Sequence, residues 1–133
     1  MFRLNNIKEL GFIKYGECDI QNNTLAFKLT KESSISNFLY AFVVKTEVRY
    51  IGKSTQSIYK RLNGSKNPGT TQRTNIRVKG LLSNTIGDGK KVDIYVFVQK
   101  EKAFYRGFEI NIAAGLEDTI IRIFQPSWNI SGK

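Results

Sequence analysis

The sequence predicts a small α/β domain of the α+β type, in which an antiparallel or mixed central sheet is flanked by helices in the order ββααβα. Two short β-type runs, 38–44 and 48–51, flank a polar triplet at 45–47, which is typical of a tight hairpin. In the run 92–98 every second residue is Val or Ile, which predicts a strand with one apolar face. Near the C-terminus, apolar residues recur at three- and four-residue steps, which indicates an amphipathic helix.

Residues 1–37 are expected to form an N-terminal β extension. It would pack on a main domain of residues 38–133, so that the two form one compact unit. The runs 12–15 and 25–29 predict two short strands, and the pair Asn22-Asn23 predicts the turn between them. A polar connector at 31–37 then leads into the hairpin.

A short helix is expected directly after the hairpin. Ser54 or Thr55 can cap it, and it covers about 56–62 before the helix-ending pair Asn63-Gly64. The next residues, 65–72, are rich in polar and turn-forming types and predict a loop.

Two further helices follow in the sequence. Thr74 or Asn75 can cap the first, which stops near the glycines at 87–89. After the strand 92–98, the segment 100–107 predicts a linker or a hairpin-like excursion, and the last helix covers 108–124. The apolar stripe of that last helix comprises Ala113, Leu116, Ile120, Ile121 and Phe124.

The composition excludes several classes of protein. At 133 residues with 41% hydrophobic and 12% aromatic residues, the chain is globular and large enough to bury a core. The single cysteine, Cys18, rules out an intramolecular disulfide and fits a reducing cytoplasm. No apolar run approaches the roughly 20 residues that span a bilayer, and the N-terminus has no apolar signal core. We therefore expect a soluble cytoplasmic protein without a membrane partner.

Histidine is absent, which removes the commonest general base and the commonest zinc ligand. Any catalysis must therefore rely on tyrosine, lysine, arginine and carboxylates, with a metal bound through oxygen where one is needed.

Positive charge is concentrated in one stretch. The formal net charge is +10, and residues 45–80 carry nine Lys or Arg against the single acidic residue Glu47, which leaves +8 in that stretch. Such segregation favours a polyanionic partner, and nucleic acid is the commonest one. A generally basic, solvated surface is the plainer alternative.

Glu117 is an anomaly on the last helix. It lies four residues after Ala113 and three before Ile120, so it shares the apolar face, whereas the neighbouring Asp118 faces away. A carboxylate at such a position needs a cation, a metal ion or a water network. Alternatively, it sits on the flank of the stripe and reaches solvent.

Arg61 and two tyrosines are further candidates. Arg61 occupies the boundary of its short helix, where its guanidinium can bind a phosphate. Tyr40 and Tyr50 alternate with apolar residues on adjacent strands, so both hydroxyls can open toward one side. A tyrosine acts as a base near neutral pH only beside positive charge, which Lys53 and Arg61 could supply. Plain packing is the alternative for either tyrosine.

The order of these residues resembles the GIY-YIG nuclease family over about residues 38–130. The second motif is intact as Tyr50-Ile51-Gly52, and the first is Phe38-Leu39-Tyr40, in which only the tyrosine is kept. Within the family, the chain looks similar to the small phage-encoded endonuclease II group, through its Pro-x-Trp-Asn-Ile stretch at 126–130, and to restriction-enzyme and bacterial relatives.

The resemblance implies a GIY-YIG fold and hydrolysis of DNA phosphodiester bonds at a site with one Mg²⁺ or Mn²⁺ ion. Glu117 would hold the metal, and Arg61 would neutralise charge on the phosphoryl oxygens. Tyr40 would activate water, helped by Tyr50 and by the positive field of Lys53. The remaining implied residue, Asn129, would hold a tyrosine or a phosphate by hydrogen bonds.

Double-stranded DNA is the expected partner. A set of polar and basic residues from the first helix to the second would position the duplex, and it comprises Lys60, Lys66, Arg73, Asn75, Arg77 and Lys79. Cutting both strands with one site per chain would favour a dimer or a tetramer.

Two other functions fit the same residues. A nucleic-acid-binding protein without catalysis could use the same basic stretch. A structural module could pair Glu117 with Arg61 and dock an acidic protein on its basic face.

Overall fold

The protein is built around a five-stranded sheet. The computed structural model describes residues 2–31, 37–54, 56–58, 60–62 and 73–129, and for 73–75 it describes the backbone alone. The strands of this sheet run in the order β2-β1-β5-β3-β4, and every neighbouring pair is antiparallel. The strands are β1 (Ile13–Gln21), β2 (Thr24–Leu29), β3 (Phe38–Val44), β4 (Glu47–Ser54), β5 (Val92–Val98), β6 (Ala103–Tyr105) and β7 (Phe108–Ile110). The helices are α1 (Leu4–Leu10), α3 (Arg73–Gly87) and α4 (Ile112–Phe124).

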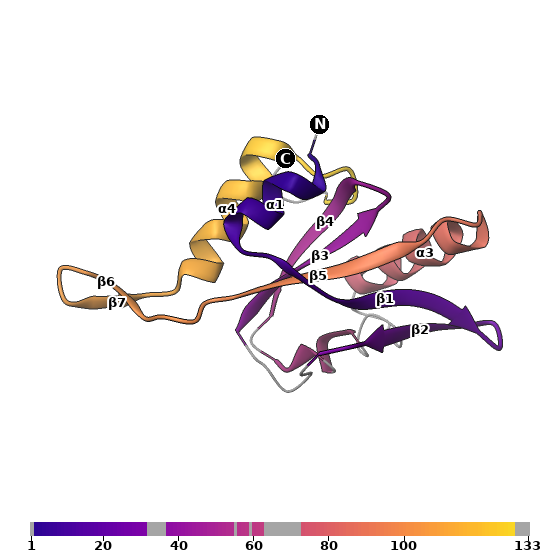
Figure 1. The fold of residues 1–133 in the computed structure, drawn as a ribbon, viewed down its shortest axis with the longest axis horizontal. Coiled ribbons are helices and arrows are strands. Elements are labelled where there is room, and N and C mark those ends of the chain that lie inside the picture. The colour runs from indigo at the N-terminus through magenta and orange to yellow at the C-terminus, as the bar shows by residue number, and fades with distance from the viewer. Residues whose placement is uncertain (1, 32–36, 55, 59, 63–72, 130–133) are drawn as a thin grey trace.

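The helices cover both faces of the sheet and create two hydrophobic cores. In the buried strand β3, alternate side chains point to opposite faces, as the two-residue repeat of a strand requires. Tyr40 and Phe42 join a core with Val78 and Leu82 of α3, whereas the intervening residues of β3 join a core with α1 and α4. Figure 1 shows α1 and α4 together, apart from α3. The predicted α+β class with an antiparallel sheet is confirmed.

The N-terminal segment differs from the prediction in two ways. Its two strands and the turn at Asn22-Asn23 are confirmed, but β1 also pairs with β5, so the strand pair extends the central sheet. The sequence reading also missed helix α1, whose left-handed cap is Gly11. Among the described residues no helix is long and apolar enough to cross a membrane.

Three predicted helix starts are wrong. Helix α3 already includes Arg73, so neither Thr74 nor Asn75 caps it. The short helix is capped by Ser57 rather than by Ser54. The Ser57 hydroxyl oxygen accepts a hydrogen bond from the Lys60 amide, and the Ser57 carbonyl oxygen accepts one from the Arg61 amide. Thr55 and the helix end at 63–64 lie outside the described residues. The last helix begins at Ile112, not at 108, because the Asn111 side chain accepts from the Ala114 amide and caps it there.

Residues 103–110 form the separate hairpin β6–β7, which projects away from the body of the protein (Figure 1). The hairpin-like excursion predicted at 100–107 is thus confirmed, although its second strand takes residues assigned above to the last helix.

A β-bulge brings the two tyrosines of the main hairpin to one face. Phe42 lies opposite Tyr50 while Val43 lies opposite Val48, so Arg49 has no partner on β3. If Arg49 paired with Phe42 in a regular ladder, Tyr50 would lie opposite Ala41 and on the other face from Tyr40. The bulge is therefore what places both rings in the same core.

Gly52 makes room for the Tyr40 ring. It lies directly opposite Tyr40, and a Cβ atom at Gly52 would come within 3.0 Å of three atoms of that side chain, its hydroxyl oxygen included. Tyr40 is only 1% exposed, so the ring has little space to move away. Glycine is required at this position because the Tyr40 ring approaches the backbone too closely to leave room for a side chain.

Replacing Gly52 with alanine should lower the free energy of unfolding by about 1–3 kcal/mol, the usual cost of overpacking a core. Urea unfolding measures this change. Gly80→Ala in α3 is the matched control, since a Cβ there has open space and removal of a helical glycine should stabilise the protein by about 0.5–1 kcal/mol. Equal stability of Gly52→Ala and the wild type would contradict the proposed contact.

Candidate active site

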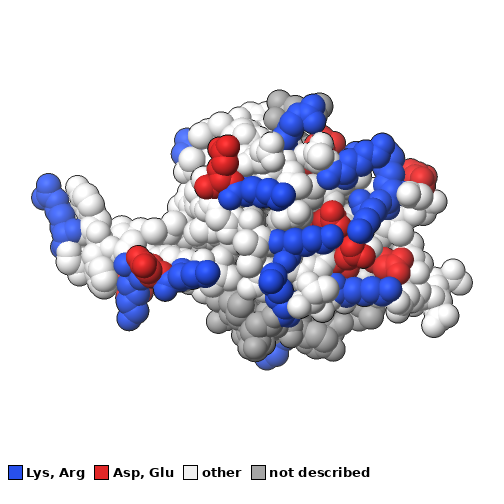
Figure 2. Space-filling model, in the orientation of Figure 1, with Lys and Arg blue, Asp and Glu red and all other residues white. Residues whose placement is uncertain are grey.

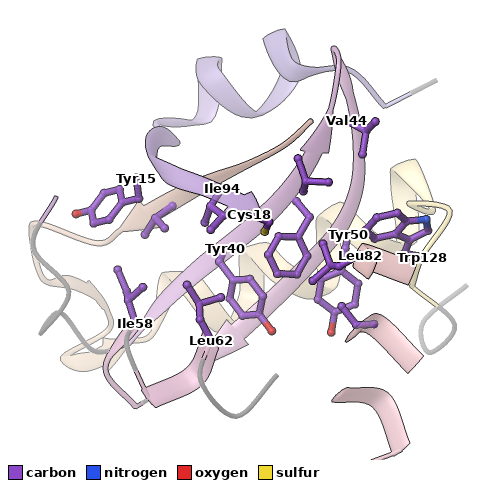
Figure 3. Close-up of a cluster of buried hydrophobic side chains, with 14 of the residues drawn as sticks. Tyr15, Cys18, Tyr40, Val44, Tyr50, Ile58, Leu62, Leu82, Ile94 and Trp128 are labelled. Atoms are coloured by element: carbon purple, nitrogen blue, oxygen red, sulfur yellow. The ribbon is translucent and has the colours of Figure 1, made fainter. Parts of the chain in front are cut away.

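Tyr40 and Tyr50 present their hydroxyl groups to the same side of the sheet. Figure 3 shows the two rings side by side with both oxygens pointing the same way, and their centroids lie 6.0 Å apart. Phe42 holds both rings, stacked on Tyr50 and edge-on to Tyr40. The expected common orientation of the two hydroxyls is confirmed.

Arg61 lies across these hydroxyls. Its Nε donates a hydrogen bond of 3.0 Å to the Tyr40 hydroxyl oxygen, and its guanidinium carbon is 5.6 Å from the centroid of that ring. Arg61 also interacts with the hydroxyl group of Tyr50. The helical turn that starts at Ser57 positions Arg61, and Ile58 and Leu62 anchor this turn in the core.

The environment of Tyr40 opposes its ionisation. Burial raises the pKa of the Tyr40 hydroxyl above its usual range, and the neighbouring Tyr50 acts in the same direction. The charge and hydrogen bond of Arg61 lower that pKa, as predicted, but burial outweighs them. Tyr40 is therefore a neutral phenol at pH 7.

Glu117 lies on the part of α4 that faces these cations. Its side chain is half-buried, and burial raises the pKa of the carboxyl group while Lys53 and Arg61 lower it. Within the described part of the chain, the carboxylate forms no hydrogen bond and no ion pair. The predicted alternative of a Glu117–Arg61 ion pair is therefore wrong.

A divalent cation fits the position of Glu117. A partly desolvated carboxylate without a protein partner offers hard oxygen ligands, which Mg²⁺ and Mn²⁺ prefer. No group of three or more acidic or cysteine ligands gathers among the described residues, so such an ion would keep several waters.

A recess lies beside Arg61. Its volume is about 410 Å³, and its lining residues are Lys53, Ser54, Gln56 and Arg61. Two of these four side chains are cationic, and Lys53 is exposed. The recess therefore suits an anionic group.

Asn129 belongs to the C-terminal segment 126–129, here called the strap, which hydrogen-bonds to the outer edge of β4. Its amide donates to the Ile51 carbonyl oxygen at 2.9 Å and accepts from the Ile51 amide at 3.0 Å, so both polar groups bond the backbone rather than a tyrosine or a phosphate. The Trp128 amide donates to the carbonyl oxygen of the bulged Arg49 at 2.8 Å. The strap thus holds the residues on both sides of Tyr50.

The predicted DNA-binding residues that the structure describes lie on the short helix and on α3, on the same side of the sheet as Arg61. Lys60 is exposed and Lys79 is half-buried. Arg77 donates a bond of 2.6 Å to the Trp128 carbonyl oxygen, which gives it a structural role in holding the strap. Of the others, Arg73 and Asn75 lie in the first turn of α3 with only their backbone described, and Lys66 lies outside the described residues.

A different face of the molecule carries both signs of charge. Figure 2 shows lysine and arginine interspersed with acidic residues over the region of β1 and β2. Ion pairs join Lys28 to Asp19 and Lys91 to Glu17, at 3.2 and 2.6 Å. Local neutralisation there leaves the net positive charge to the segment 45–80.

The antiparallel sheet and the grouping of Tyr40, Tyr50, Arg61 and Glu117 define the chain as one with the GIY-YIG nuclease fold, so the resemblance drawn from the sequence is confirmed. The chain is similar to a glutamate-to-alanine mutant of bacteriophage T4 EndoII, with 25% identity and a TM-score of 0.73 over 98% of this chain and 100% of that one. It also shares its fold with the restriction endonuclease HPY188I in complex with product DNA, at 17% identity and a TM-score of 0.59 over 93% of this chain and 82% of that one. No protein-family model matches the sequence, and no curated protein does.

Sequence reasoning missed three contributors to the site. Gln56 lines the recess, but a polar residue before a helix carries no signal of its own. The role of Gly52 depends on its position opposite Tyr40, which the bulge sets. Trp128 belongs to the Pro-x-Trp-Asn-Ile stretch noted in the sequence, but its burial and its bond to Arg49 depend on a contact between distant segments.

Replacing Asn129 with leucine should lower the free energy of unfolding by about 2–6 kcal/mol, because the buried amide and carbonyl of Ile51 lose their partners at about 1–3 kcal/mol each. Chemical denaturation measures the loss. The control is Asn84→Leu on the exposed side of α3, which should change stability by no more than about 0.5 kcal/mol. Similar effects of the two substitutions would show that the strap does not stabilise β4.

Proposed function

We propose that this chain is a divalent-metal-dependent DNA endonuclease that hydrolyses phosphodiester bonds with one metal ion per active site. The observation that carries the proposal is the hydrogen bond of Arg61 to the Tyr40 hydroxyl, with Glu117 half-buried in the field of the same arginine. Similarity to bacteriophage T4 EndoII and to a restriction endonuclease in complex with product DNA supports the same activity.

Glu117 would hold the metal through its carboxylate oxygens. A bound Mg²⁺ or Mn²⁺ ion supplies Lewis-acid polarisation of the scissile phosphate and stabilises the departing oxygen. The residue suits this role because its carboxylate has no described protein partner, while Lys53 and Arg61 favour its ionised form.

Arg61 and Lys53 would bind the phosphate itself. The recess that they line, of about 410 Å³, has room for a phosphodiester group and its waters. The hydrogen bond to Tyr40 fixes the direction of the guanidinium before substrate arrives, and such preorganised charge is effective in stabilising a transition state. Arg61 would neutralise the charge that develops on the phosphoryl oxygens.

The tyrosines would orient the attacking water. Since the Tyr40 hydroxyl oxygen accepts from Arg61, its own proton is directed elsewhere and can be donated to a neighbouring oxygen. Burial keeps Tyr40 protonated at rest, so it acts first as an orienting group. Removal of a proton from water by Tyr40 requires its ionised form, which Arg61 favours and burial disfavours.

A non-catalytic nucleic-acid-binding protein is the second candidate, and the raised pKa of Tyr40 is the observation that favours it. Both candidates bind DNA, and binding by either should weaken as salt is added. Cleavage therefore distinguishes them. If the wild-type chain binds a plasmid and leaves it intact with Mg²⁺ and with Mn²⁺, the endonuclease proposal fails.

Glu117→Gln should abolish nicking of a supercoiled plasmid, with a loss of at least about a hundredfold, because the neutral amide is a poor ligand for a hard cation. Gel electrophoresis of the nicked and linear products measures the rate, and EDTA should reproduce the loss in the wild type. Asp118→Asn is the control, since this neighbouring carboxylate is exposed and paired with Arg122 at 3.0 Å. The metal assignment is wrong if both variants lose the same activity.

Tyr40→Phe and Tyr50→Phe should each slow cleavage by roughly 10²–10⁴-fold, the usual contribution of a positioned proton-transfer group. DNA binding, measured by gel shift, should change little, because phosphate contacts come from lysine and arginine. Tyr95→Phe is the control, since this buried tyrosine belongs to the core on the opposite face of the sheet. Full activity in both site variants would refute the role assigned to the hydroxyls.

A further inference from the structure

Ser54 is a buried hydroxyl group, 7% exposed, whose hydrogen atom has no acceptor in the described part of the chain. Its oxygen accepts a hydrogen bond of 3.0 Å from the Gln56 amide. Tyrosines aside, the other buried polar side chains among the described residues are Thr85, which donates to a backbone carbonyl, and Asn129, which uses both ends of its amide. A hydroxyl group that accepts a hydrogen bond can still donate one. The Ser54 hydrogen is therefore available to a bound molecule.

Ser54 faces the side of the sheet that carries the two site tyrosines. Tyr50, Gly52 and Ser54 are two residues apart on β4, so all three face the same side. The register agrees, because Gly52 lies opposite Tyr40 and Ser54 lies opposite Phe38, and both of these aromatic residues belong to one core. Ser54 thus continues the row of site residues to the end of the strand.

The recess beside Arg61 is where this hydroxyl group meets solvent. Ser54 lines it together with Lys53, Gln56 and Arg61, and its volume is about 410 Å³. The two cations attract an anion, but charge alone does not fix the position of each anionic oxygen. A hydroxyl group does so, because its hydrogen bond to a charged oxygen is short and directional.

The chain on both sides of Ser54 is held in place. Ser54 is the last residue of β4 and pairs with the fully buried Phe38. Farther along the chain, Ile58 is also fully buried, and the bond from the Gln56 amide fixes the Ser54 oxygen between these two anchors. A hydroxyl group that accepts one hydrogen bond also becomes a stronger donor of another. The donor is therefore preorganised before an anion arrives.

We propose that Ser54 is a further phosphate ligand, whose hydroxyl group donates a hydrogen bond to a non-bridging oxygen of the phosphodiester in the recess. This inference rests on the proposed endonuclease function, which brings a phosphodiester to that recess. Arg61 and Lys53 supply positive charge, whereas Ser54 holds one phosphate oxygen and so sets the orientation of the group. The alternative is a structural role, in which Ser54 serves the Gln56 amide alone.

Titration with dimethyl phosphate, a minimal phosphodiester, tests the proposal without metal or DNA. NMR signals of Lys53 and Arg61 report occupation of the recess. Ser54→Ala should weaken binding by roughly 10–100-fold, the usual effect of losing a hydrogen bond to a charged group. Ser54→Thr keeps a hydroxyl group and should restore most of the affinity. Urea unfolding checks that each variant is folded.

Ser57→Ala is the matched control for the structural role. The Ser57 hydroxyl oxygen accepts from the Lys60 amide at 3.2 Å, much as the Ser54 oxygen accepts from Gln56, but Ser57 is outside the set of residues that line the recess. The substitution therefore loosens the short helix without removing a donor from the recess. It should weaken binding of dimethyl phosphate far less than Ser54→Ala does.

The proposal is overturned if dimethyl phosphate causes no saturable shift of the Lys53 and Arg61 signals, or if Ser54→Ala binds it as tightly as the wild type. It is also overturned if Ser57→Ala weakens binding as much as Ser54→Ala, or if a folded Ser54→Thr binds no better than Ser54→Ala. The titration involves neither metal nor cleavage, so its failure is distinguishable from failure of the endonuclease function, which an uncut plasmid would show.

Discussion

The candidate site depends on how Tyr40 packs against Gly52. The buried ring of Tyr40 lies against Gly52, which has no Cβ atom, because the register of β3 and β4 places the two residues opposite each other. The register in turn depends on the bulge at Arg49, which moves Tyr50 to the face of Tyr40. Arg61 can contact both hydroxyls only because the two rings then share one face. The bulge at Arg49 therefore places the two tyrosines on one face.

A bulge at an edge strand needs support, and the C-terminal strap supplies it. β4 has β3 on one side alone, so its outward amides and carbonyls lack a neighbouring strand. Trp128 bonds the carbonyl of Arg49, and Asn129 bonds both backbone groups of Ile51. Tyr50 is thus fixed from two sides by residues that lie almost 80 positions away in the sequence. Through these bonds Asn129 holds the backbone next to Tyr50.

Local patterns predicted the elements whose signals are local. The strand at 92–98 has the predicted bounds, and the apolar stripe of the last helix identified Glu117 as a carboxylate on the buried side. The start of that helix was misplaced because Phe108 and Ile110 continue an apolar pattern that Asn111 interrupts with its cap. Neither the bulge nor the strap could be predicted, since each depends on contacts between distant segments. Arg61 was predicted beside the tyrosines, whereas the backbone partner of Asn129 was beyond sequence reasoning.

Burial fixes the position of the Tyr40 hydroxyl group and also opposes its ionisation. A fully packed ring holds its hydroxyl in one place, which catalysis by positioning requires. The same packing removes water and raises the pKa of the phenol, so a buried tyrosine is a poor base unless a cation compensates. Arg61 supplies that cation through a hydrogen bond. In the proposed function, Arg61 would bind the phosphate as well as lower the pKa of Tyr40. If a bound phosphate pulled Arg61 away from Tyr40, the ionised form of Tyr40 would lose part of its stabilisation. Arg61 can therefore serve both groups only if it contacts Tyr40 and the phosphate at the same time. The position of Arg61, between the hydroxyls and the recess, meets that condition.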